Sequence, residues 1–78
     1  MERTAKRYTV NWCRYPHGIE GEAMVCHSRE FCNLYTAKRF LRNRLHAIKS
    51  INWAGGWIED EHCNWLYSID DEGNIDDR

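Results

Sequence analysis

Only one segment of the chain has a long helical period: NLYTAKRFLRNRLHAIKS, residues 33–50. Its apolar residues recur at spacings of three and four, which places them on one stripe of an α-helix. The stripe consists of Leu34, Ala37, Leu41, Leu45 and Ile48, and Phe40 and Ala47 widen it. A helix of this length is marginally stable alone in water, so the stripe needs a partner surface from the rest of the chain.

Both ends of this segment carry the signals expected of helix termini. Asn33 is a favourable N-cap, because its side-chain oxygen accepts from a free backbone N–H at Tyr35 or Thr36. Lys49 falls in the last turn, where a cation complements the negative end of the helix dipole. We therefore predict a continuous helix from Asn33 to Ser50.

Four further segments have the composition of β-strands, because they are rich in β-branched and aromatic residues. These segments are 7–15, 22–28, 56–61 and 65–70, and Ile75 begins a candidate fifth strand. Residues 16–21 contain the only proline and two glycines, which indicates a loop. A tight turn is expected at 62–64, with Asn64 at a positive φ. The pattern leaves 29–32 open between strand and connector.

The order of elements is β-β-α-β-β, which predicts a single α+β domain with an antiparallel sheet and one amphipathic helix packed on one face. We expect a flexible N-terminus at 1–6, the domain at 7–75 and an acidic tail at 76–78. Which face of each strand meets the helix is not fixed by the pattern. One solution packs the helix on Val10, Trp12, Val25, Ile58 and Leu66; in the fourth strand Trp65, Tyr67 and Ile69 share one face.

Location and redox state follow from what the sequence lacks. The chain has no apolar run of membrane-spanning length and no apolar secretory leader, so we expect a cytoplasmic protein without a membrane partner. Thiols are normally reduced in the cytosol. The four cysteines, Cys13, Cys26, Cys32 and Cys63, are therefore expected to be free thiols.

Metal binding and catalysis are not indicated by the spacing of cysteines and histidines. Structural zinc sites usually present ligand pairs two to four residues apart, whereas Cys26 and Cys32 are six apart and His62 and Cys63 are adjacent. No phosphate loop, dinucleotide fingerprint or nucleophile elbow is present. We expect no metal, no cofactor, no catalytic residue and no enzyme activity.

Charge is distributed unevenly along the chain. Residues 1–50 carry ten basic and four acidic side chains, whereas residues 51–78 carry one basic and eight acidic side chains. Such a split is typical of a nucleic-acid-binding face beside an acidic face, and equally of two halves that neutralise each other.

The basic candidate surface is the outer face of the predicted helix. Its cations suit the phosphates of a nucleic acid or an acidic protein partner. They are Lys38, Arg39, Arg42, Arg44 and Lys49. A purely solvated helix exterior has the same composition, because Lys and Arg favour helices.

The acidic candidate surface is the predicted C-terminal hairpin. Its carboxylates are expected to meet the basic side chains of a nucleic-acid-binding protein and to compete with the nucleic acid. They are Glu59, Asp60, Glu61, Asp70, Asp71 and Glu72. The alternative is a charged sheet edge that resists aggregation.

Tryptophan is the third binding signal. The chain contains four tryptophans, more than a domain of 78 residues buries easily. Trp53 and Trp57, which lie beside Gly55 and Gly56, are expected to be exposed and to act as interface anchors.

The element order and three local segments resemble those of small phage-encoded anti-CRISPR proteins. The segments are Asn33 to Arg39 at the helix start, Gly55 to Glu59, and Trp65 to Gly73 in the closing hairpin. The resemblance implies a compact domain that inhibits a bacterial surveillance complex by occupying its nucleic-acid path or an interface. It implies no role for any single residue.

We therefore predict a small, non-enzymatic inhibitor of phage or mobile-element type that docks on a larger, nucleic-acid-handling host complex and evades host defence. If phage-encoded, it would act in the host cytosol. The alternative is a direct nucleic-acid-binding or regulatory protein that uses the basic helix face. A homodimer is left open, because so short a chain has a small core.

Overall fold

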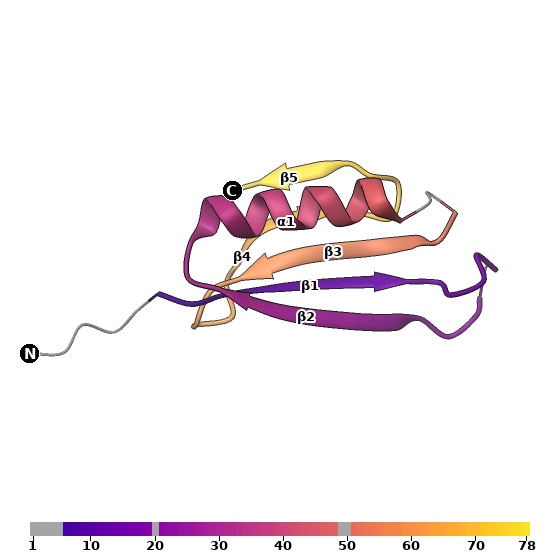
Figure 1. Ribbon diagram of the computed structural model, residues 1–78, viewed down its shortest axis with the longest axis horizontal. Coiled ribbons are helices and arrows are strands. Elements are labelled where there is room, and N and C mark those ends of the chain that lie inside the picture. The colour runs from indigo at the N-terminus through magenta and orange to yellow at the C-terminus, as the bar shows by residue number, and fades with distance from the viewer. Residues whose placement is uncertain (1–5, 20, 49–50) are drawn as a thin grey trace, which may run out of the picture.

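The computed structural model describes residues 6–19, 21–48 and 51–78. In this part of the chain, five strands and one helix form a single α+β domain, which confirms the predicted fold class and order of elements (Figure 1). The elements are β1 (Tyr8–Arg14), β2 (Val25–Phe31), α1 (Leu34–Ala47), β3 (Trp53–Glu59), β4 (Trp65–Ile69) and β5 (Ile75–Asp77). Within the described residues, no helix is long and apolar enough to cross a bilayer.

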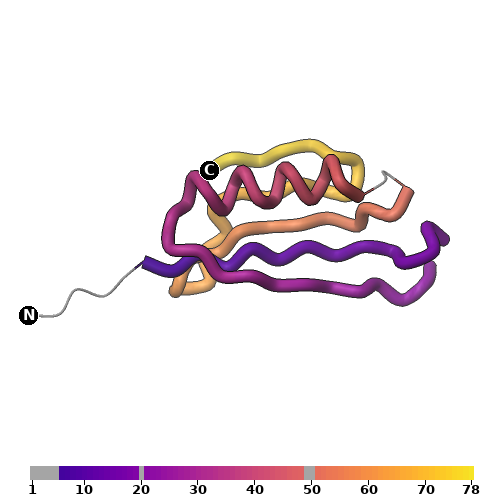
Figure 2. Tube along the Cα trace, viewed as in Figure 1, coloured from indigo at the N-terminus to yellow at the C-terminus, as the bar shows by residue number. Residues whose placement is uncertain are grey.

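The strands form one antiparallel sheet in the order β2-β1-β3-β4-β5. The strands β2 and β5 are therefore the two edges, and β1 and β3 pair near the centre. Figure 2 shows the chain passing from β2 into α1, which runs lengthwise along the sheet. One face of the sheet is covered by α1, and we call the opposite face the open face.

The helix begins at the predicted cap and ends before the predicted exit. Asn33 Oδ1 accepts a hydrogen bond from the backbone N–H of Thr36 at 3.0 Å, as expected of an N-cap. Ile48 is already extended, at φ −99° and ψ 129°, so α1 ends at Ala47. The predicted last residues, Lys49 and Ser50, lie outside the described residues.

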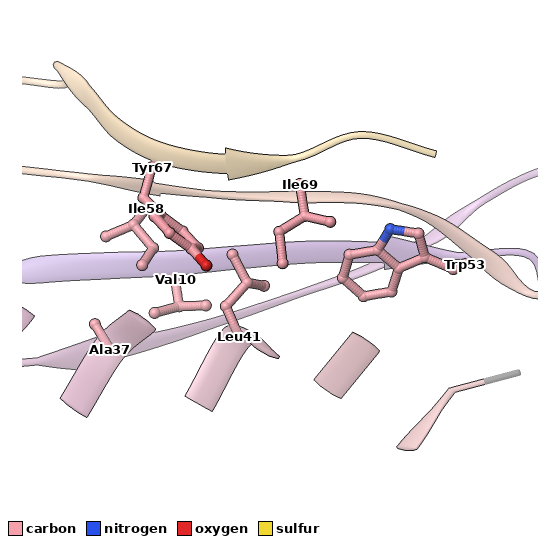
Figure 3. Packing of buried hydrophobic residues seen from close by; sticks show 7 residues of the cluster. All are labelled: Val10, Ala37, Leu41, Trp53, Ile58, Tyr67 and Ile69. Carbon is pink, nitrogen blue, oxygen red and sulfur yellow. The ribbon is translucent and has the colours of Figure 1, made fainter. Parts of the chain in front are cut away.

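The core lies between α1 and the covered face of the sheet (Figure 3). Its buried members are Val10, Ala37, Leu41, Trp53, Ile58, Tyr67 and Ile69. Leu41 packs directly over Gly56, where an added Cβ would lie 2.7 Å from Leu41 Cδ1 and 3.0 Å from the carbonyl oxygen of Asn11. Glycine at position 56 therefore allows the helix to approach the sheet closely.

The predicted inward face was correct at some positions and wrong at others. Val10 and Ile58 are buried, and Trp12 is half-buried with its ring edge-on to Phe40 at 5.2 Å. Val25 is exposed because it begins the edge strand β2. Leu66 is only half-buried, since alternation along β4 points Tyr67 and Ile69 into the core instead.

Two strands begin at positions that differ from the prediction. The strand β2 begins at Val25, because the carboxylate of Glu22 closes the preceding loop by accepting from the backbone N–H groups of His17 and Ile19. The strand β3 begins at Trp53, because the glycine pair lies inside the strand beneath the helix. The sequence left residues 29–32 open between strand and connector, and the structure places them in β2 as far as Phe31.

The C-terminal end of the chain differs from the expected domain bounds. Residues 76–77 pair with β4 in strand β5, with Asp76 opposite Ser68 and Asp77 opposite Tyr67. They belong to the sheet and not to a separate acidic tail. Of the predicted flexible N-terminus, residues 1–5 lie outside the described residues.

Candidate protein-binding groove

A groove of about 630 Å³ crosses the open face of the sheet. Trp57 and Trp65 line it on β3 and β4, and Tyr15 and Met24 line it beside β1 and β2. The disulfide-bonded Cys13 and Cys26 also line it. We call this feature the aromatic groove. Among the described residues that line it, only Asp70 and Asp71 are charged, so the groove is apolar inside and acidic at its border.

The two tryptophans of the groove are brought together by a β-bulge. Trp57 alternates with the core residue Ile58 and therefore faces the open side. The register shifts between Ile58 and Glu59, which places Glu59 opposite Trp65. The indole rings of Trp57 and Trp65 consequently stack at 5.1 Å with an interplanar angle of 15°.

The prediction that Trp65 shares a face with Tyr67 and Ile69 is therefore wrong. Trp65 is 50% exposed, whereas Tyr67 and Ile69 are buried. Strict alternation missed Trp65 as a candidate site residue, because it assumes an unbroken register and the bulge breaks it next to Trp65. No residue in the sequence marks this bulge.

Of the two tryptophans expected to be exposed, one is buried and one lines the groove. Trp53 is 2% exposed in the core, and its indole N–H donates to the carbonyl oxygen of Asp70 at 2.8 Å. The prediction of an exposed Trp53 is wrong, because its place at the start of β3 lies under the helix. Trp57 is half-buried and contributes to the aromatic groove.

The cysteines are not four free thiols, as the sequence had suggested. Cys13 and Cys26 are directly opposite each other on β1 and β2 and form a disulfide. Cys32 and Cys63 are free and exposed. Sequence separation alone gave no signal for the pair, because it depends on the register between two strands. A stable disulfide is typical of oxidising compartments, and the cytoplasmic location stays a prediction.

The two turns that flank β4 have the same geometry. In each, the aspartate Oδ1 accepts from the backbone N–H groups two and four residues later, and Oδ2 accepts from the asparagine side chain. The turns are residues 60–64 (DEHCN) and 70–74 (DDEGN). The fourth residue has a positive φ in both, 65° at Cys63 and 89° at Gly73. This is a type I turn closed by a bulge, and the predicted positive φ at Asn64 is wrong.

These hydrogen bonds take up the carboxylates of Asp60 and Asp70. The backbone N–H of Asn64 lowers the pKa of Asp60 below its usual value, and the backbone N–H of Asn74 does the same for the pKa of Asp70. Both groups stay ionised and add negative charge. Their oxygens, however, hold the turns together, so a direct partner contact through them would have to displace these bonds.

The six acidic residues predicted as one surface fall into two groups at opposite ends of β4. Glu59, Asp60 and Glu61 lie at the β3–β4 turn, where Glu61 Oε2 also accepts from the backbone N–H of Arg7 at 3.3 Å. Asp70, Asp71 and Glu72 lie at the β4–β5 turn. Five strand residues separate the groups by roughly 17 Å. Of these six residues, only Asp70 and Asp71 line the aromatic groove.

The predicted basic helix face is also divided. Lys38 pairs with Asp77 at 2.9 Å and lies over the Tyr67 ring, so it is engaged with the sheet. Arg39 and Arg42 are exposed, and Arg44 is half-buried beside Phe40. Lys49 lies outside the described residues. Among the described ion pairs, only Lys38–Asp77 links the helix to the C-terminal acids, so the two halves do not simply neutralise each other.

No group of three or more His, Cys, Asp or Glu side chains is placed to hold a metal ion in the part of the chain that the structure describes. Comparison with known proteins adds no functional assignment: no protein family, curated protein or solved structure matches the chain.

Proposed function

We propose that this protein is a small, non-enzymatic inhibitor that docks on a host protein complex handling nucleic acid, in the manner of the anti-CRISPR proteins it resembles. The aromatic groove is the observation that carries the proposal. It combines a stacked tryptophan pair with an acidic border on the one face of the sheet that the helix leaves uncovered.

The chemistry of the groove favours a basic protein surface as its partner. Surfaces that bind nucleic acid are rich in Lys and Arg, whose charge complements Asp70 and Asp71. Arginine side chains also stack on indole rings, so Trp65 suits the same partner. A protein bound in this way would cover a surface that otherwise holds nucleic acid.

The exposure of Trp65 supports a binding role. Half of its surface is exposed although Trp57 packs against it. Partly exposed tryptophans that become buried on association are frequent hot spots, where truncation to alanine costs about 2 kcal/mol or more of binding energy. The residual exposed surface is thus available for a partner.

The test is affinity purification from host cytosol, followed by direct binding measurements with the captured complex. Trp65→Ala and Asp71→Lys should each weaken binding at least about tenfold, which corresponds to ~1.4 kcal/mol. Added nucleic acid should compete for the same basic surface and release the protein from the captured host complex. The inhibitor should act at a stoichiometric ratio to its target and without turnover.

Matched controls exist on surfaces away from the groove. Tyr35→Ala removes an aromatic ring that is 65% exposed on the helix. Glu61→Lys reverses the charge at the position of the β3–β4 turn that corresponds to Asp71. Both variants should bind as the wild type does. Equal loss in the groove variants and these controls, or no loss in either set, would rule out the aromatic groove as the docking site.

A further inference from the structure

A second surface, the junction between α1 and β2, gathers arginines around one aromatic ring. The guanidinium carbons of Arg29, from β2, and Arg44, from α1, each lie 5.2 Å from the centroid of the Phe40 ring. Arg29 also lies 5.3 Å from the centroid of Phe31. Cation–π attraction holds each guanidinium in place, yet it brings two like charges to the same ring. We call this junction the arginine seam.

No carboxylate neutralises the arginine seam within the described residues. Across the described residues, the carboxylates that form ion pairs are those of Glu30, Glu61, Asp76 and Asp77. None of them pairs with Arg29 or Arg44. The helix itself contains no acidic residue. The charge of the seam is therefore uncompensated on the side that faces solvent.

The buried part of the seam contains an unsatisfied donor. Arg44 Nε is buried and has no hydrogen-bond partner among the described residues. A buried donor on a charged group that lacks a partner is costly, and an anion close to the guanidinium lowers that cost. Arg44 thus adds positive charge behind the pocket of the seam, and its buried Nε gains from a nearby anion without contacting it.

A pocket of about 240 Å³ opens at the seam, lined by Arg29, Phe31, Thr36, Arg39, Phe40 and Asn43. The three polar helix residues lie on one side of α1, because they are spaced by three and four. Arg39 and Arg29 approach the pocket from opposite walls, the helix and the edge strand. Guanidinium groups match phosphate oxygens in bidentate geometry, and the side-chain amide of Asn43 adds a neutral donor.

We propose that the arginine seam binds the phosphate backbone of a polynucleotide. The positive charge continues from β2 to the end of β1, where Arg14 Nε donates a hydrogen bond to Nε2 of His27 at 3.3 Å, and His27 lies two residues from Arg29 on the same face of β2. Arg39, Arg29 and Arg14 come from the helix and two neighbouring strands, and such a series of cations suits a linear polyanion better than a single small anion. This site lies on the helix side of the sheet and does not depend on the aromatic groove.

The test is fluorescence anisotropy with labelled DNA of 20 nucleotides, single-stranded and duplex, at 50 and 200 mM salt. The wild-type protein should bind at least one form, with an affinity that falls as salt rises. Arg29→Gln and Arg39→Gln should each weaken binding about three- to tenfold and reduce the slope against log salt by about 1. Thermal unfolding of each variant shows whether it is folded.

The matched control is Arg42→Gln, which removes the same charge from an exposed position of the same helix outside the pocket. It should change the affinity less than about twofold. An Arg42→Gln effect equal to that of Arg39→Gln would overturn the proposal, because it would indicate general attraction to the helix exterior.

Two further outcomes would also overturn it. One is the absence of DNA binding at 50 mM salt; the other is binding of inorganic phosphate at the seam without any binding of DNA. Trp65→Ala should leave DNA binding unchanged. The experiments therefore distinguish failure of the proposed phosphate binding at the arginine seam from failure of the proposed docking at the aromatic groove.

Discussion

The covered and open faces of the sheet use the same strands for different purposes. On the covered face, Trp53 and Ile58 are buried against Leu41 of the helix. On the open face, Trp57 and Trp65 stack on each other with no second layer above them in the described part of the chain, and Trp65 stays half exposed. Aromatic area on the covered face therefore stabilises the fold, whereas aromatic area on the open face is available for a partner.

The largest expected difference is between one tryptophan of each face. Trp53→Ala should lower the free energy of unfolding by about 3–5 kcal/mol, because it leaves a cavity in the core and removes a hydrogen bond to Asp70. Trp65→Ala should lower it by only about 1 kcal/mol, the order of a lost aromatic stack. Urea unfolding followed by circular dichroism measures both.

Trp53→Phe keeps this comparison usable if Trp53→Ala does not fold. It retains a buried ring but loses the indole N–H, so its stability should lie between those of the wild type and Trp53→Ala. Equal losses of unfolding free energy at Trp53 and Trp65 would contradict the division between a face that stabilises the fold and an open face that does not.

The disulfide is the one covalent constraint on the open face. Cys13 and Cys26 are 13 residues apart, and closing a loop of about 15 residues stabilises a fold by about 3 kcal/mol. Cys13→Ser with Cys26→Ser should therefore lower the midpoint of urea unfolding markedly. Cys32→Ser, at an exposed free thiol, is the control and should have little effect.

A thiol titration tests the disulfide directly. The denatured, unreduced protein should show two reactive thiols, Cys32 and Cys63, and the reduced protein four. Four thiols before reduction, in protein purified with thiol exchange blocked, would restore the original expectation of reduced cysteines.

A smaller effect comes from the two turns that flank β4. Cys63 holds a left-handed conformation that favours glycine, and Gly73 occupies the corresponding position of the other turn. Cys63→Gly should raise the free energy of unfolding by about 1 kcal/mol, and Gly73→Ala should lower it by a similar amount. Changes of opposite sign in the midpoint of thermal unfolding would confirm that the two turns are equivalent. Changes of the same sign would contradict it.

The smallest effect concerns pH. Turn hydrogen bonds hold the pKa of Asp60 and Asp70 below the ordinary value of 3.8, so their stabilising contribution is present above that pH. It is lost as the pH falls through the lowered pKa, when the carboxylates of the folded state become protonated. Asp60→Asn with Asp70→Asn should make the urea midpoint fall less steeply below pH 3.8 than in the wild type.

Glu72→Gln provides the control for this pH series. It removes a carboxylate of the β4–β5 turn whose side chain takes part in none of the turn hydrogen bonds of the described residues. The steepness of its pH dependence should stay close to that of the wild type.

The elements that depend on neighbours along the chain were predictable from the sequence. The helical period and the Asn33 cap placed α1 to within a few residues, and strand composition placed four strands and a candidate fifth. The order of elements followed, and with it the two-layer α+β fold. Periodicity and capping are local properties, so a single sequence contains enough information to read them.

Most of the proposed binding surfaces were decided by the tertiary structure. The bulge that turns Trp65 to the open face, the pairing of Cys13 with Cys26 and the burial of Trp53 all depend on strand register. The gathering of Arg29 and Arg44 around Phe40 depends on where the helix lies over β2. A shift of one residue in register exchanges the two faces of a strand, and no residue next to Trp65 marks the shift there, although Gly55 lies beside the shift between β1 and β3.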